Sequence, residues 1–174
     1  IASCLVGSEM CIRDRNEIAA AVSVLKESGK ILDFGVSNFS PSQLSLLDNK
    51  TAVSVNQIEF SLTQHLAMHN GVLDQLLQKE ILPMSWSPLG SFFKEATKTN
   101  TRIKKVLDTF TKKYNATEDQ LLLAWILKHP SGVIPVVGTT SKVRLQNAVK
   151  ALDIELDLED WFTLLVECQG HKVP

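Results

Sequence analysis

"DFGVSNFSPSQL", residues 33–44, is the stretch that decides the fold. Its first half has the residues of a short buried strand, and this strand runs directly into Ser37 and Asn38. Ser40 and Pro41 then supply the cap and the first residue of a helix. An α/β protein typically binds its ligand where a strand ends in small polar side chains and a helix begins.

The same order of strand and helix recurs along the chain. β-rich runs predict four strands, at 31–37, 52–60, 81–90 and 132–138. Apolar spacing, caps and stop residues predict helices at 17–28, after Pro41, at 70–80, at 101–114, from the Thr117–Gln120 capping box to Pro130, at 142–151 and at 157–168. Residues 91–100 are expected to form an irregular insertion.

The apolar positions also predict which side chains form the core. The helical faces expected to be buried contain Ile18, Val22, Leu25, Leu44, Leu47, Val72, Leu73, Leu76 and Leu77. Trp125 and Trp161 are expected to anchor the core from two later helices.

Strands that alternate with helices are joined by crossovers, so the sequence predicts an α/β fold with a parallel sheet. The uneven spacing between strands argues against a solenoid of equal repeats. Two architectures remain: an open doubly wound sheet, and part of an eight-unit barrel. Periodicity does not distinguish between them.

Composition narrows the function. Hydrophobic residues make up 44% of the 174, and 18 Lys+Arg stand against 19 Asp+Glu. This predicts a single globular domain with no net field to attract nucleic acid or an anionic membrane. The apolar run at 121–127 is far shorter than the roughly 20 residues that cross a bilayer. A small molecule is therefore the expected partner.

The cysteines, at positions 4, 11 and 168, show neither a metal-ligand spacing nor a disulfide framework. This pattern predicts a reducing compartment, the cytoplasm. His65 and His69 are four residues apart, but no third ligand accompanies them, so no metal is predicted.

The first fifteen residues differ from the rest of the chain. "SCLVGSEMCIRDR" has neither helical nor strand periodicity. It resembles a peptide that arises when sequencing-adapter DNA is translated. Residues 1–15 are therefore predicted to be a non-native leader, and residues 16–174 to be the natural sequence, cut from something longer.

Each predicted strand ends in polar or special residues, and these are the candidates for a site. They are Ser37 and Asn38, Asn56 and Gln57, Trp86 and Ser87, and the run from Gly138 to Ser141. The run "GTTSKVRLQN", 138–147, begins with a glycine and three hydroxyl residues, and a helix is expected to start after them. Arg144 lies one turn into that helix. Because a guanidinium binds phosphate through a planar fork, this motif predicts a phosphate site.

Four motifs together carry a family resemblance: "GVSNFSPSQL", "VNQIEFS", "PMSWSPLG" and "VIPVVGTTSKVRLQNAVKAL". From about residue 16 onward the chain resembles the C-terminal half of an aldo-keto reductase. The resemblance implies a partial TIM (β/α)8 barrel, with strands five to eight and the C-terminal helices. It also implies binding of NADPH without a Rossmann domain.

The resemblance assigns thirteen residues to the coenzyme. Ser37, Asn38 and Gln57 would bind the nicotinamide carboxamide, and Trp86 would stack on the nicotinamide ring. Ser87, Leu89 and Ser91 would meet the pyrophosphate; Gly138, Thr139, Thr140 and Ser141 would form the adenosine-phosphate loop; Arg144 would hold the 2′-phosphate; Asn147 would lie near the adenine. The preference between NADPH and NADH stays open, because Gly138 stands where some members have Lys, for which Lys142 could compensate.

The family's catalytic Asp, Tyr, Lys and His belong to the first four barrel strands, which the resemblance does not cover. Tyr114 lies in a predicted helix and matches none of these motifs. No catalytic residue is therefore assigned, and the chain alone is expected to be inactive, while its parent would reduce an aldehyde or ketone. Two alternatives stay open: a non-catalytic nicotinamide-binding or regulatory module, and an inert truncated fragment.

Overall fold

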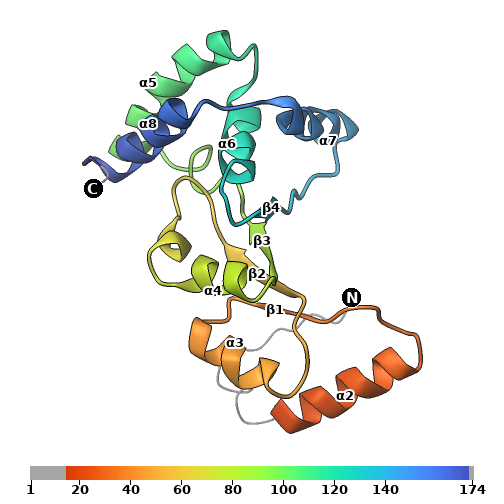
Figure 1. The fold of residues 1–174 in the computed structure, drawn as a ribbon. Coiled ribbons are helices and arrows are strands. Elements are labelled where there is room, and N and C mark those ends of the chain that lie inside the picture. Colours follow the sequence, from red (N-terminus) through yellow and green to blue (C-terminus); the bar gives the residue numbers. More distant parts are fainter. Residues whose placement is uncertain (1–14, 173–174) are drawn as a thin grey trace. The chain divides into compact units, whose positions relative to one another are not determined.

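The computed structural model describes residues 15–172. Figure 1 shows the elements along the chain. They are α2 (Arg15–Glu27), β1 (Gly35–Ser37), α3 (Pro41–Asp48), β2 (Val55–Glu59), the 3-10 helix η1 (Leu66–Met68), α4 (Val72–Gln78), β3 (Leu82–Trp86), α5 (Lys98–Lys113), α6 (Glu118–Leu127), β4 (Ile134–Pro135), α7 (Lys142–Val149), the 3-10 helix η2 (Lys150–Asp153) and α8 (Leu158–Gln169).

The strands form one sheet in the order β1-β2-β3-β4. β1 and β2 pair in parallel, with Gly35 opposite Val55 and Ser37 opposite Gln57. The predicted alternation of strands and helices is confirmed, although the strands are shorter than expected. β4 covers only two residues, and its Pro135 has no backbone N–H to donate to a neighbouring strand.

The described chain divides into two compact units. Unit 1 comprises residues up to 58 together with 67–84, and unit 2 comprises residues 59–66 together with those from 85 onward. Within the described residues, none of the helices is both long enough and apolar enough to cross a membrane.

The core of unit 1 follows the predicted helical faces only in part. Leu44, Leu73 and Leu76 are almost fully buried. Leu25 and Leu77 share the spacing of buried neighbours but are 37% and 58% exposed. The apolar pattern therefore predicted the helices correctly and overestimated how much of each face is covered.

Local capping explains where α3 begins. The Ser40 hydroxyl accepts a bond from the Gln43 backbone N–H, and the Gln43 side chain accepts one from the Ser40 N–H. This reciprocal box satisfies donors that the first turn of a helix otherwise leaves open, and Pro41 fixes the first helical residue.

Two stacked indoles anchor the core of unit 2, as predicted. The rings of Trp125 and Trp161 lie 4.8 Å apart and 3° from parallel. Each indole N–H donates to the backbone carbonyl of the other residue, at 3.1 Å from Trp125 and 2.8 Å from Trp161. The pair therefore joins α6 to α8 without leaving a buried donor unsatisfied.

The start of α5 corrects the predicted insertion at 91–100. The helix begins at Lys98, because Thr97 takes the cap position and its hydroxyl accepts from the Asn100 N–H at 3.0 Å. The irregular segment is therefore shorter than expected. α5 then packs against α8 (Figure 1).

Candidate functional site

In unit 1, the tip of β1 is fastened to β2 at the predicted residues. The Ser37 hydroxyl and the Asn38 backbone N–H both donate to the carbonyl of Gln57, each at 2.9 Å. Ser37 and Asn38 are exposed, and Gln57 is half-buried. The structure therefore brings these three predicted residues together at one strand end.

A buried amide, which the sequence placed among the polar strand ends without a role toward the coenzyme, holds this tip in place. Asn56 is 0% exposed; its Oδ1 accepts from the Phe39 N–H at 3.3 Å, and its Nδ2 donates to the Phe39 carbonyl at 3.0 Å. This clamp fixes the backbone just after Asn38, whose φ of +57° is uncommon for a side-chain-bearing residue. Successive residues of a strand face opposite sides of the sheet. Two neighbouring polar residues, Asn56 and Gln57, therefore indicated that one of the two amides faces the interior.

In unit 2, the loop after β3 is fixed by close approach to another segment. Ser87 and Gly90 have φ values of +52° and +55°. A Cβ at Gly90 would lie 2.0 Å from Oγ1 of Thr63 and 2.5 Å from Oγ of Ser61, so only glycine fits there. The Ser91 N–H donates to the same Thr63 hydroxyl at 3.0 Å. Trp86, half-buried, is the last residue of β3 and leads into this loop.

A cavity of about 860 Å³ lies in unit 2. Its walls come from the loop after β3, the segment after β4, and helices α6 and α7. The predicted residues among its lining are Ser87, Leu89, Gly138, Thr139 and Arg144. Residues more than fifty positions apart in sequence are thus brought to one concave surface, which is where ligands usually bind.

The start of α7 orders one wall of this cavity. The Ser141 hydroxyl caps the helix and accepts from the Arg144 N–H at 3.4 Å, while the Ser141 N–H donates to Thr139 Oγ1 at 3.1 Å. Arg144 and Ala148, one turn apart, both line the cavity. Thr140 is exposed and Ser141 half-buried, but neither is part of the lining.

Asn147 ties α7 to α6. Its Oδ1 accepts from Gln120 Nε2 at 2.8 Å, and its Nδ2 donates to Thr117 Oγ1 at 3.1 Å and to Asp119 Oδ2 at 3.0 Å. Gln120 also completes the predicted capping box at Thr117. Asn147 therefore has a structural role in joining α7 to α6. Its predicted contact with adenine stays a prediction.

The charged groups of the cavity are Lys94, Arg144 and Asp119. Two cations against one carboxylate favour an anionic ligand. Lys94 was not among the predicted residues. It lies in the segment expected to be an irregular insertion, and the sequence alone gives no indication of which loop residues reach a cavity.

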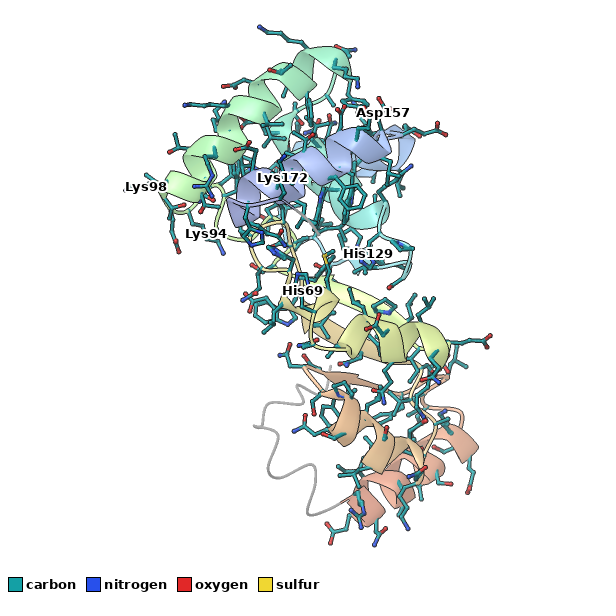
Figure 2. The ribbon with its side chains drawn as sticks, turned by 60° about the vertical axis from the view of Figure 1, so that its left-hand side comes forward. His69, Lys94, Lys98, His129, Asp157 and Lys172 are labelled. Carbon is teal, nitrogen blue, oxygen red and sulfur yellow. The ribbon has the colours of Figure 1, made fainter. Side chains whose placement is uncertain are left out.

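Other titratable groups of unit 2 have structural partners. The Tyr114 hydroxyl donates to Asp160 Oδ2 at 2.6 Å and accepts from the Asp157 N–H at 3.0 Å. Desolvation, followed by the bond to Asp160, raises the pKa of Tyr114. Lys113 pairs with both carboxylates at 2.7 Å (Figure 2 labels Asp157). Tyr114 thus helps to link α5 to α8 and is not part of the cavity lining.

Among the described residues, no group of three or more His, Cys, Asp or Glu side chains could hold a metal ion. His65 has other partners: Leu62 O lies 2.9 Å from its Nδ1, and Gln169 Nε2 lies 3.3 Å from its Nε2.

The sequence matches the aldo/keto reductase family over residues 10–165. The chain belongs to the aldo/keto reductase family. The match begins inside the segment 1–15 that was predicted to be a non-native leader; residues 1–14 lie outside the described part of the structure, and the adapter origin stays a prediction.

Individual aldo-keto reductases and oxidoreductases are similar over nearly the whole chain. It is 35% identical over 168 residues to the uncharacterized oxidoreductase YcsN of Bacillus subtilis, covering 94% of this chain and 56% of YcsN. It is 35% identical over 164 residues to the 6-dehydroglucose reductase of Agrobacterium fabrum, covering 92% and 54%. The chain thus spans about half the length of these curated relatives.

A solved structure shows the same fold. The crystal structure of a thermostable aldo-keto reductase in complex with the inhibitor epalrestat superimposes with a TM-score of 0.78 at 22% identity. The superposition covers 88% of this chain and 54% of that enzyme. The α/β fold with a parallel sheet is therefore that of an aldo-keto reductase.

Proposed function

We propose that this chain is the C-terminal, coenzyme-binding half of an enzyme that reduces an aldehyde or ketone with NADPH. Membership of the aldo/keto reductase family supports oxidoreductase chemistry with a nicotinamide coenzyme. The observation that carries the proposal is the cavity of about 860 Å³, because five residues assigned to the coenzyme by sequence line it together.

The residues present fit the phosphate-bearing part of the coenzyme. Arg144 offers a planar, permanently charged fork for the 2′-phosphate, and Thr139 adds a hydroxyl. Gly138, which also lines the cavity, carries no side chain between its backbone and a ligand. The Arg144 guanidinium is the group expected to make the chain bind NADPH more tightly than NADH.

For the nicotinamide part, we propose that Ser37, Asn38 and Gln57 bind the carboxamide and that Trp86 stacks on the ring. Support comes from the fixed tip of β1, since a side chain on a fixed backbone orients its ligand at little entropic cost. When bound, NADPH supplies the hydride. The chain's own residues bind and orient it.

We place the catalytic Asp, Tyr, Lys and His in the part of the parent that this chain does not span. Tyr114, the single tyrosine, is engaged with Asp160 and Asp157, which supports this assignment. The chain alone should therefore bind coenzyme without turnover, and we assign the parent to the cytoplasm. A non-catalytic nicotinamide-binding module remains the second candidate, because the described cavity lining contains neither Tyr nor His.

Calorimetric titration of the 174-residue chain with NADPH and NADH tests the proposal. Arg144→Met should weaken NADPH binding about tenfold and leave NADH binding unchanged, because only NADPH carries the 2′-phosphate. Lys150→Met, which removes an exposed cation at the end of α7 outside the cavity lining, is the matched control. If the wild-type chain binds neither coenzyme, the proposal is wrong.

A further inference from the structure

We propose that Lys94 is a second phosphate-binding cation of this cavity, and that it binds the diphosphate shared by NADPH and NADH. The inference rests on the proposed coenzyme function and extends it by a residue that no motif indicated. Lys94 lies in the loop before α5 (Figure 2), and its side chain lines the cavity together with Arg144.

The loop that carries Lys94 is held at several points. Asn100, 5% exposed, donates from Nδ2 to the carbonyls of Ser91 at 3.1 Å and Glu95 at 2.7 Å. The Ser91 N–H is in turn bonded to Thr63. Lys94 therefore sits between two anchored residues, so its backbone position is set although its side chain is exposed.

The turn around Lys94 is closed by its own backbone. The Lys94 and Glu95 N–H groups both donate to Ser91 O, at 2.9 and 3.0 Å. Phe92 is buried beneath this turn at 9% exposure, and the exposed Phe93 packs edge-on against it with ring centroids 4.8 Å apart. A cation carried on a fixed backbone loses less entropy on binding an anion than one on a mobile loop.

The two cations come from different walls of the cavity. Lys94 shares its loop with Ser87 and Leu89, which are assigned to the pyrophosphate, whereas Arg144 follows the Gly138–Ser141 run. The carboxylate of Asp119 also lines the cavity but is occupied, since it accepts from Thr117 Oγ1 at 2.5 Å and from Asn147 Nδ2 at 3.0 Å. The arrangement fits a ligand with two separate anionic groups.

A second cavity, of about 500 Å³, also includes Lys94 in its lining. Its other cation, Lys104, is already paired with Glu118 and Asp108, each at 2.5 Å. Opposite charges next to each other leave little attraction for a further anion there, so the larger cavity is the better phosphate site.

The test compares Lys94→Met, Arg144→Met and Lys98→Met in the 174-residue chain by calorimetric titration at fixed ionic strength. Lys94→Met should raise the Kd for NADPH and for NADH by the same factor, about fivefold, so the ratio of the two is unchanged. Arg144→Met should change the ratio. Lys98→Met removes the same charge four residues away, outside both cavities, and should change neither Kd (Figure 2).

Three other outcomes of these titrations would contradict the inference, and they can be told apart. Equal Kd values for the Lys94→Met and Lys98→Met variants would leave the coenzyme function standing and exclude Lys94 as a ligand. A loss confined to NADPH would assign Lys94 to the 2′-phosphate instead. Absence of binding to either coenzyme by the wild-type chain would overturn both proposals. Lys94→Arg should retain binding if charge is what matters.

Discussion

At the scale of single residues, the candidate site combines side chains that sequence motifs reveal with others that only the fold reveals. Ser37, Gln57 and Arg144 stand in motifs, so the positions of the first two at strand ends and of Arg144 in the first turn of a helix were predictable. The clamping role of Asn56 and the presence of Lys94 in the cavity were not predicted, because contact with Phe39 and access to a cavity depend on distant parts of the chain. Residue type alone does not distinguish these roles.

Asn38 combines a backbone requirement with a proposed binding role, and two substitutions separate them. Its φ of +57° favours glycine, so Asn38→Ala should lower the free energy of unfolding by about 1 kcal/mol while Asn38→Gly should not. If the amide binds the carboxamide, both variants should weaken NADPH binding. Urea unfolding and calorimetric titration measure the two effects, and undiminished binding by Asn38→Gly would show that only the backbone matters.

The thiol of Cys168 predicts a loss of stability at alkaline pH. Burial raises its pKa from 9.0 to about 11, and its Sγ donates to Leu62 O at 3.0 Å. Between these values the unfolded thiol has lost its proton and the folded one has kept it. The free energy of unfolding should therefore fall by up to about 2.7 kcal/mol as pH rises through this window, at about 1.36 kcal/mol for each pH unit.

Cys168→Ala removes this ionisable group while leaving Tyr114 in place as a second alkaline-titrating group. Unfolding by urea at several pH values should show a smaller decline for the variant than for the wild type. Equal declines would mean that the thiol is not the source.

At the scale of elements, the order of helices and strands and both capping boxes were predictable from local chemistry. The start of α5 was missed because Thr97 lies in a polar run with several possible caps. The exposure of Leu77 was missed for a different reason. Periodicity shows which residues share a face, but another element has to cover that face.

The link between α6 and α7 gives a prediction at this scale. Gln120→Ala and Asn147→Ala should each lower the free energy of unfolding by about 2 kcal/mol, and the double variant should cost about 1 kcal/mol less than the sum, because both remove the same bonds. If Asn147 acts by positioning α7, both single variants should weaken NADPH binding similarly.

Gln43→Ala is the control. It removes a capping box but no bond between two helices of the kind that Gln120 makes with Asn147, and it should lower the free energy of unfolding by about 1 kcal/mol. Urea unfolding and calorimetric titration supply both readouts. Loss of NADPH binding in Asn147→Ala alone would favour direct contact with the adenine.

At the scale of the whole molecule, alternation of strands and helices was enough to predict an α/β fold with a parallel sheet, because few other arrangements connect such elements. The division into two units was not predicted. It follows from packing between residues far apart in sequence, such as Leu62 with Cys168, which a single sequence does not display.

The stacked indoles have an optical consequence. All three tryptophans, at 86, 125 and 161, belong to unit 2. Tryptophan emission therefore reports on that unit directly, while loosening of α2 or α3 within unit 1 would go unseen by it. Two parallel rings 4.8 Å apart should also couple their electronic transitions, giving a paired circular-dichroism band that is lost when α6 and α8 separate. An unfolding curve followed by this signal would measure the stability of unit 2 and would not report the stability of unit 1.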